Sequence, residues 1–194
     1  MPDALRVPVL AAGDFVLRPW RLDDLPLVRE ASSDPYIPLL TTVPAVYSDD
    51  AGERFVERQW QRAREGTGYP FVIADRPTDR PLGVMSLRMK DAADGRASIG
   101  YWLVRSARGR GAAAAALRAV TAWAFEDLRI PRLELYVEPW NTASARTAER
   151  AGFQREGLLR GWQRIGAERR DMAMYALLAT DATAPHPADP PAAD

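Results

Sequence analysis

The residues that most constrain the fold of this chain lie between positions 99 and 128, where two different periodicities meet. Residues 99–104 form an apolar run that predicts a β-strand. Beyond a turn at residues 105–111, apolar side chains recur at three- and four-residue spacing, which predicts a helix ending near residue 128. The positions of this stripe are Ala113, Ala116, Leu117, Val120, Ala124 and Leu128. The chain therefore runs from a strand through a glycine-bearing turn into a helix.

The turn between these two elements has the composition of an anion-binding loop. The first backbone N–H groups of a helix have no partner inside the helix, and the helix dipole favours negative charge there. Gly109 and Gly111 carry no side chain that would keep a ligand away from those groups. The turn also carries the arginines Arg105, Arg108 and Arg110. We interpret it as a phosphate-binding loop, although an arginine-rich solvated turn that only precedes a helix would have the same residues.

Two loop patterns fit these residues. Gly109, Gly111 and Ala114 satisfy the relaxed dinucleotide pattern G-x-G-x-x-A. Arg108, Gly111 and Ala113 satisfy R-x-x-G-x-A, which resembles the pyrophosphate loop of the GCN5-related N-acetyltransferases, the GNAT superfamily. A dinucleotide-binding fold usually opens on its fingerprint, whereas more than half of this chain precedes the loop. Position along the chain therefore favours the second pattern.

A second block follows the predicted helix. Residues 137–144 and 148–153 resemble the V-x-P-x-N-x-x-S and A-x-[KR]-x-GF patterns of the same superfamily. The matching positions are Val137, Pro139, Asn141, Ser144, Ala148, Arg150, Gly152 and Phe153. Two such blocks in this order favour an N-acetyltransferase. A nicotinamide-dinucleotide oxidoreductase, in which Glu134 or Glu138 would bind the ribose, stays as an alternative.

Composition and charge argue against several other classes of protein. The chain has 194 residues, of which 47% are hydrophobic, as expected for one domain. A formal net charge of zero gives no general attraction to nucleic acid or membrane. The absence of cysteine excludes a thiol nucleophile, and the single histidine, His186, makes a histidine base or a zinc site unexpected. With no signal peptide or membrane-spanning run, we expect a cytoplasmic protein.

The order of elements indicates the fold class. We expect an N-terminal arm at residues 1–13, an acetyltransferase domain at 14–179 and a disordered Pro/Ala-rich tail at 180–194. Residues 32–47 predict an apolar, proline-rich loop that is a lid, a binding wall or packed on the core, and residues 161–168 predict a hairpin loop. The order is similar to that of the GNAT fold, an α/β (α+β) fold. We therefore expect a mixed, mostly antiparallel sheet of about seven strands, splayed between strands four and five and flanked by about four helices.

The resemblance implies that acetyl-CoA is the cosubstrate and that no metal takes part. The strand before the loop would hydrogen-bond the pantetheine arm, and one of its N–H groups would stabilise the oxyanion. The residues concerned are Trp102, Leu103 and Val104. The pyrophosphate would be held by Arg108, Gly109, Arg110, Gly111, Ala112 and Ala113.

The second block would supply the remaining contacts. The resemblance implies that Asn141 contacts the pantetheine amide, unless it is only a helix cap. Ser144, one turn later on the same face, would hydrogen-bond the leaving thiolate. Arg150 is a weaker candidate for the ribose phosphate of the coenzyme. For Ser144 and Arg150 a place on the helix surface without a function is the alternative.

The general base is open at this point. Glu138, at the polar end of the strand beside the predicted splay, is the first candidate, Glu134 is the second and water is the third. An α-amine, with a pKa of about 8, needs less help to lose its proton than a lysine amine at about 10.4. The lack of an obvious base therefore favours a weakly basic amine as the acceptor.

The runs at residues 15–19, 99–103, 153–157 and 170–175 resemble those of one branch of the superfamily. This is the RimJ/RimL-like branch, which acetylates the N-termini of ribosomal proteins, and the resemblance covers residues 14–178. This implies direct transfer of an acetyl group to a primary amine in a ternary complex, with a protein N-terminal α-amine favoured. A small-amine or antibiotic N-acetyltransferase is the alternative, and a non-catalytic acyl-CoA-binding or partner-binding module is the alternative of another class. We allow for a homodimer and expect no contact with nucleic acid.

The acceptor would lie among the 32–47 loop, the following helix and the 161–168 hairpin. Aromatic residues in and around these segments are candidates for its wall, although any one of them is more often a core residue than a contact. They are Tyr36, Tyr47, Trp60, Tyr69 and Trp162.

Overall fold

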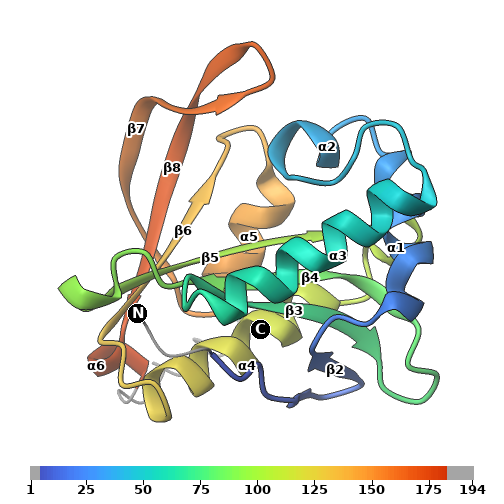
Figure 1. Ribbon diagram of the computed structural model, residues 1–194. Helices are drawn as coiled ribbons and strands as arrows, with labels where there is room; N and C mark the ends of the chain where they lie inside the picture. Colours follow the sequence, from blue (N-terminus) through green and yellow to red (C-terminus); the bar gives the residue numbers. More distant parts are fainter. Residues whose placement is uncertain (1–4, 183–194) are drawn as a thin grey trace, which may run out of the picture.

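The computed structural model describes residues 5–182, which form a single mixed β-sheet with helices packed on it (Figure 1). The sheet has eight strands in the order β1-β2-β3-β4-β5-β6-β8-β7. All neighbouring strands are antiparallel except β5 and β6, which are parallel. The strands are β1 Leu10–Ala12, β2 Phe15–Arg18, β3 Gly68–Asp75, β4 Pro81–Arg88, β5 Arg96–Leu103, β6 Arg132–Val137, β7 Gln154–Ile165 and β8 Glu168–Leu178. The predicted mixed, mostly antiparallel sheet is confirmed.

The sheet parts between β5 and β6. The two strands pair only from Arg96 and Arg132 to Ile99 and Leu135. Beyond that point β5 continues to Leu103 and β6 to Val137 without pairing to each other. These are the fourth and fifth strands that the sequence predicts, so the splay lies where the resemblance implies. Backbone groups that face this gap are available to a ligand.

Helices cover both faces of the sheet. The helices are α1 Leu25–Ser32, α2 Ile37–Leu40, α3 Asp49–Arg64, α4 Ala112–Glu126, α5 Thr142–Arg150 and α6 Ala179–Ala182. Tyr69 and Phe71 of β3 pack edge to face on Trp123 of α4, with ring centroids 4.7 and 5.7 Å apart. Side chains alternate along a strand, so Pro70 and Val72 point to the opposite face. That face is covered by α3, which Figure 1 shows running across the sheet.

Local sequence explains where the two longest helices begin. The side chain of Ser48 caps α3 by accepting a hydrogen bond from the N–H of Ala51 at 3.2 Å, and two aspartates occupy its first turn. α4 has no such cap. It begins after Gly111 in a left-handed conformation, with φ of 80°. The first turn of α4 therefore keeps its N–H groups free of side chains.

The structure differs from the expected elements in several places. Residues 10–12, within the expected arm, form β1 and pair with β2. A one-turn helix, α2, interrupts the expected loop at 32–47, and α6 includes residues 180–182 of the expected tail. The rest of that tail, with His186, lies outside the described residues. Within residues 5–182 the chain thus has eight strands and six α-helices, against about seven and about four expected.

The prediction of a hairpin loop at residues 161–168 is wrong. β7 runs through Gly161 to Ile165, and the turn end of the long β7–β8 hairpin extends beyond the other strands of the sheet (Figure 1). Gly161 has φ of 54° and lies where the pairing of β7 with β8 shifts between Leu159 and Gln163. A glycine at a strand irregularity of this kind marks a bulge as well as a turn. The sequence could not distinguish the two.

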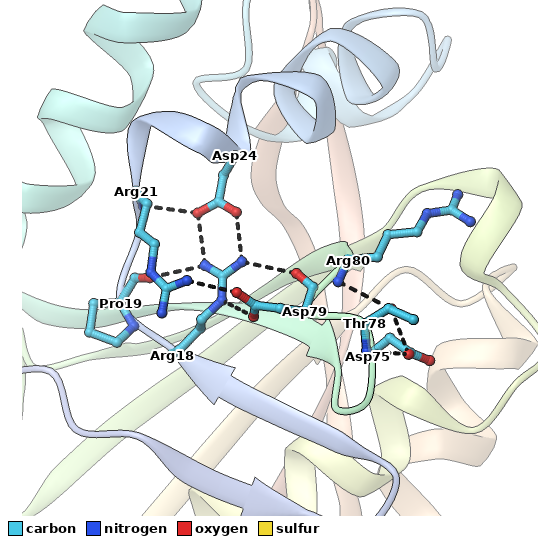
Figure 2. A network of polar contacts seen from close by, with 8 residues as sticks. All are labelled: Arg18, Pro19, Arg21, Asp24, Asp75, Thr78, Asp79 and Arg80. Carbon is cyan, nitrogen blue, oxygen red and sulfur yellow. Dashed lines mark hydrogen bonds and ion pairs between the residues drawn. The ribbon is translucent and has the colours of Figure 1, made fainter.

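A buried ion-pair network fixes the end of β2 and the turn between β3 and β4 (Figure 2). The guanidinium of Arg18 donates to both carboxylate oxygens of Asp24, at 2.8 and 2.9 Å, and to Asp79 at 2.6 Å. Arg18 is 4% and Asp24 1% exposed. Burial alone would lower the pKa of Arg18, but its bonds to the two aspartates outweigh this effect and raise it. The network holds the turn in which Asp75 lies.

Candidate active site

A cavity of about 390 Å³ opens where β5 and β6 part. Its wall comes from α2, α3, the facing sides of β4, β5 and β6, and the start of α5. The lining residues used below are Tyr36, Arg62, Arg88, Gly100, Tyr101, Trp102, Tyr136, Glu138, Asn141 and Ser144. Residues separated by more than a hundred positions in the chain thus meet around one space.

The β5 backbone presents hydrogen-bonding groups to the gap. The N–H of Val104 donates to the carbonyl of Leu82 at 3.1 Å, so Val104 and Trp102 direct their backbone groups to β4. Alternation along an antiparallel pair then directs the N–H groups of Leu103 and Tyr101 to the β6 side, where pairing has ended. Of the three residues expected from the sequence, Leu103 is therefore the one whose N–H faces the gap. Its own carbonyl accepts a hydrogen bond from Arg108 at 3.1 Å.

The expected phosphate-binding loop leads directly into α4. Gly109 and Gly111 both have φ of 80°, a backbone angle that residues with a side chain rarely adopt. A Cβ atom on either glycine would meet open space. Ala112 and Ala113 follow as the first residues of the helix. The glycines are therefore required by the backbone turn, and the space above it is free for an anion at the uncapped helix N-terminus.

Acidic residues hold the arginines of this loop. Arg108 pairs with Asp34 at 2.7 Å, and Arg110 pairs with Asp75 at 3.1 Å. A hydrogen bond from Thr78, followed by the contact with Arg110, lowers the pKa of Asp75. Both arginine side chains are about half exposed, at 49%. They are therefore tethered at the rim of the loop, with surface left for a ligand.

Asn141 and Ser144 face the cavity from the first turn of α5. The side-chain oxygen of Asn141 accepts a hydrogen bond from the N–H of Ser144 at 3.1 Å, so Asn141 is a helix cap. The cap leaves its NH₂ group available as a donor. The carbonyl of Ser144 accepts a hydrogen bond from the hydroxyl of Tyr101 at 3.4 Å.

Tyr101 lines the cavity and is not among the residues predicted from the sequence. It reaches α5 from β5. Burial raises the pKa of Tyr101, so its hydroxyl keeps its proton at neutral pH and can donate a hydrogen bond. Alternation of residues along the predicted strand would have placed it beside the gap.

The two candidate bases have different surroundings. Glu138 lines the cavity at 6% exposure, and no hydrogen bond or ion pair engages its carboxylate within residues 5–182. Glu134 does not line it, and accepts bonds from Arg132 and from the hydroxyl of Tyr136, both at 2.8 Å. Burial and then the bond to Glu134 raise the pKa of Tyr136 to about 12. Glu138 is thus the carboxylate that is free to take a proton in the cavity.

The aromatic residues expected in the wall around the acceptor have different positions in the structure. Tyr36 lines the cavity and packs edge to face on Trp140 at 5.2 Å. Trp60 does not line it, because its indole N–H donates to the carbonyl of Trp20 at 2.9 Å on the core side of α3. Trp162 is 52% exposed on β7 and stacks on Tyr136, which does line the cavity.

Arg150 lies exposed in the last turn of α5 and does not line the cavity. It makes no ion pair within residues 5–182, and Glu149 instead accepts a bond from Tyr175 at 3.5 Å. Across the same residues, no group of three or more His, Cys, Asp or Glu side chains is arranged to hold a metal ion. None of the helices described there is long and apolar enough to cross a membrane.

Comparison with known proteins places this geometry in a family. The model of the acetyltransferase (GNAT) domain matches residues 14–154. The chain is 30% identical over 164 residues to the uncharacterized N-acetyltransferase p20 of Bacillus licheniformis, covering 84% of this chain and 92% of that protein.

Solved structures agree. RimJ of Mycobacterium smegmatis, in complex with CoA-disulfide, is 26% identical with a TM-score of 0.77, over 92% of this chain and 89% of that one. A GNAT-family acetyltransferase of Bacillus anthracis is 22% identical with a TM-score of 0.75, over 89% and 99%. With the domain match, the parted sheet and the glycine loop before α4, the chain belongs to the GNAT superfamily of N-acetyltransferases, in its RimJ/RimL-like branch.

Proposed function

We propose that this enzyme transfers the acetyl group of acetyl-CoA directly to a primary amine in a ternary complex, with the N-terminal α-amine of a protein as the favoured acceptor. The observation that carries the proposal is the cavity at the parting of β5 and β6. A free β5 edge, the buried carboxylate of Glu138 and the start of α5 meet there. The relative RimJ of Mycobacterium smegmatis, solved with CoA-disulfide, supports CoA as the carrier.

The residues fit the parts of the thioester. The pyrophosphate lies on the free N–H groups at the start of α4, flanked by Arg108 and Arg110. The pantetheine arm runs along the open edge of β5, and the NH₂ group of Asn141 donates to its amide. The N–H of Leu103 faces the thioester oxygen and stabilises the negative charge that develops on it.

The chemical step needs a group that accepts the proton of the amine and a group that donates a hydrogen bond to the leaving thiolate. The amine nitrogen attacks the thioester carbon, and the carbon–sulfur bond breaks. The proton lost by the amine goes to Glu138, the unpaired carboxylate of the cavity. The departing thiolate accepts a hydrogen bond from the hydroxyl of Ser144, or from that of Tyr101 after it leaves the Ser144 carbonyl to which it donates in this structure. A thiol with a pKa of about 8.5 is already a tolerable leaving group, so positioning does most of the work.

The test is acetyl-CoA consumption by the full chain against N-terminal peptides, polyamines and aminoglycosides. We expect turnover with peptides, and we expect Glu138→Gln to lower kcat by roughly a hundredfold at neutral pH. Ser144→Ala and Tyr101→Phe, measured singly and together, identify the thiolate partner. Thermal stabilisation by acetyl-CoA should survive in each variant.

Other outcomes would contradict the proposal. Preferred turnover of polyamines or aminoglycosides would assign a small-amine enzyme. Binding of acetyl-CoA without turnover of any amine would indicate a non-catalytic module. Stabilisation by NAD and not by acetyl-CoA would overturn the choice of carrier.

A further inference from the structure

The end of the cavity away from Glu138 is lined by arginines that have no acidic partner. Arg62 on α3 and Arg88 at the end of β4 both line the cavity and a neighbouring hollow of about 240 Å³. Neither forms an ion pair with any carboxylate within residues 5–182. Among the described residues, the Arg62 guanidinium hydrogen-bonds only the neutral side chain of Gln59, at 2.7 Å. The positive charges of Arg62 and Arg88 therefore have no acidic partner in that part of the chain.

Strand register explains why these two arginines meet. Arg88 and Ser86 of β4 pair with Gly68 and Pro70 of β3, which lie on the face of the sheet opposite to α4. Alternation therefore points Arg88 towards α3, the helix that carries Arg62. The guanidinium of Arg88 lies over Gly100 of β5, where a Cβ atom would come within 3.1 Å of it. Gly100 thus leaves room for the charged group.

The surroundings of Arg62 and Arg88 disfavour the positive charges of their side chains. Burial, followed by the nearby charges of Arg88 and Arg58, lowers the pKa of Arg62. Arg88 is open to the hollows, but protein atoms surround it closely enough that loss of water lowers its pKa as well. Arg58 adds a third positive charge, and its buried Nε atom has no hydrogen-bond partner within residues 5–182. A bound anion would relieve the repulsion between these groups.

The two ends of the cavity are complementary to an acceptor with two charges. Glu138 is the acidic residue of its lining. It follows the end of β6 directly, on the far side of the gap from Trp102 of β5. The Arg88 guanidinium lies over Gly100, two residues before Trp102 along β5, which is roughly 7 Å. An amine at Glu138 and an anion at Arg88 would therefore be separated by at least about two residues of extended peptide, because the width of the gap adds to this distance.

We propose that Arg62 and Arg88 bind a carboxylate of the amine acceptor, so that the preferred acceptor is a peptide N-terminus with an acidic side chain at its second or third position. This inference rests on the proposed acetyl transfer to an amine and names the substrate class of the same site. A small amino acid with its carboxylate at a similar distance from the amine offers the same chemistry. Polyamines, which bring only positive charge, are disfavoured by the arginines.

The first experiment compares acceptors. The probes are tetrapeptide amides with an N-terminal serine and with glutamate, glutamine or lysine at the second or third position, together with ε-aminocaproate as the small amino acid. We expect one glutamate peptide to exceed its glutamine counterpart in kcat/KM by about tenfold to a hundredfold, and the lysine peptide to be poorest. Equal kcat/KM for the glutamate and glutamine peptides would overturn the inference. A preference for ε-aminocaproate over every peptide would assign the arginines to a small carboxylate and overturn the peptide acceptor.

The second experiment reverses the charge. Arg88→Glu should lose the preference for glutamate peptides and favour the lysine peptide, and Arg88→Gln should remove the preference in either direction. Arg64→Gln is the matched control, because Arg64 lies exposed on the same helix as Arg62 and outside the cavity lining. An unchanged glutamate preference in Arg88→Glu would overturn the inference.

Binding measurements separate this inference from the proposed function. Thermal stabilisation of the acetyl-CoA-bound protein by each peptide is measured for the wild type and Arg88→Glu. Tighter binding of glutamate peptides that is lost in Arg88→Glu, without turnover of any peptide, would support the anion site and overturn the acetyl transfer. Turnover of all peptides with no charge preference in binding would support the acetyl transfer and overturn the anion site.

Discussion

Arg18 is buried and Arg88 opens onto the cavity, and within residues 5–182 only Arg18 has acidic partners. Arg18 meets Asp24 and Asp79 at hydrogen-bond distance, and these contacts raise its pKa (Figure 2). Arg88 has no such partner in the described part of the chain, and desolvation lowers its pKa. The first arginine therefore stabilises the fold. The second carries a charge without an acidic partner among residues 5–182, as expected of a residue that binds a ligand.

The largest effect should follow from Arg18→Met. The substitution leaves Asp24, which is 1% exposed, without its charged partner. We expect a loss of about 3–5 kcal/mol in the free energy of unfolding, measured by chemical denaturation. Arg21→Met is the control, since Arg21 makes an exposed pair with Asp79 and should cost less than about 1 kcal/mol. Equal losses in the two variants would contradict a structural role specific to Arg18.

A smaller effect should appear on acidification of the wild type. Bonds from Arg18, followed by the charges of Arg18 and Arg21, outweigh partial burial and lower the pKa of Asp79. A carboxyl whose folded pKa is lowered stabilises the protein above its unfolded pKa of about 3.9, and this contribution is lost as the pH falls through the folded value. The stability gap between the wild type and Arg18→Met should therefore narrow below about pH 4. A gap that is constant between pH 7 and pH 3, where the folded variant can still be measured, would argue against this linkage.

The smallest effect on stability should come from Arg88→Met. This change removes an uncompensated charge and keeps an unbranched side chain. The free energy of unfolding should therefore change by less than about 1 kcal/mol, and we expect a gain in stability more than a loss. Chemical denaturation measures the free energy of unfolding of both variants, so that the same substitution is compared at positions 18 and 88. A loss as large as that of Arg18→Met would show that Arg88 has a structural partner and would weaken the comparison.

Much of the fold was predictable because it depends on local periodicity. The run at 99–104, the stripe of α4 and the cap at Asn141 involve neighbours within a few positions, and each forms the expected element. The bulge at Gly161 and strand β1 were not predictable, because a glycine at a bulge and one at a turn look alike, and a three-residue strand has no measurable period.

The candidate site was predictable only in part. Gly109, Gly111 and Asn141 could be proposed from short sequence motifs, and the structure places the glycines before α4 and Asn141 at the cavity. Glu138 and Glu134 were both candidates in the sequence, and only packing shows that Glu134 is engaged by Arg132 and Tyr136. The sequence did not point to Tyr101, Arg62 and Arg88, because each lines the cavity together with residues far away in the chain.

The sequence by itself determined the strand, the glycine turn and the uncapped start of α4, since backbone conformation at Gly109 and Gly111 depends on the residues themselves. Only the tertiary structure decided which charges are compensated. Arg18 meets Asp79 across 61 positions, whereas Arg62 and Arg88 line the same cavity and have no acidic partner among residues 5–182. Such contacts depend on strand register and on the packing of helices over the sheet, which no local pattern specifies.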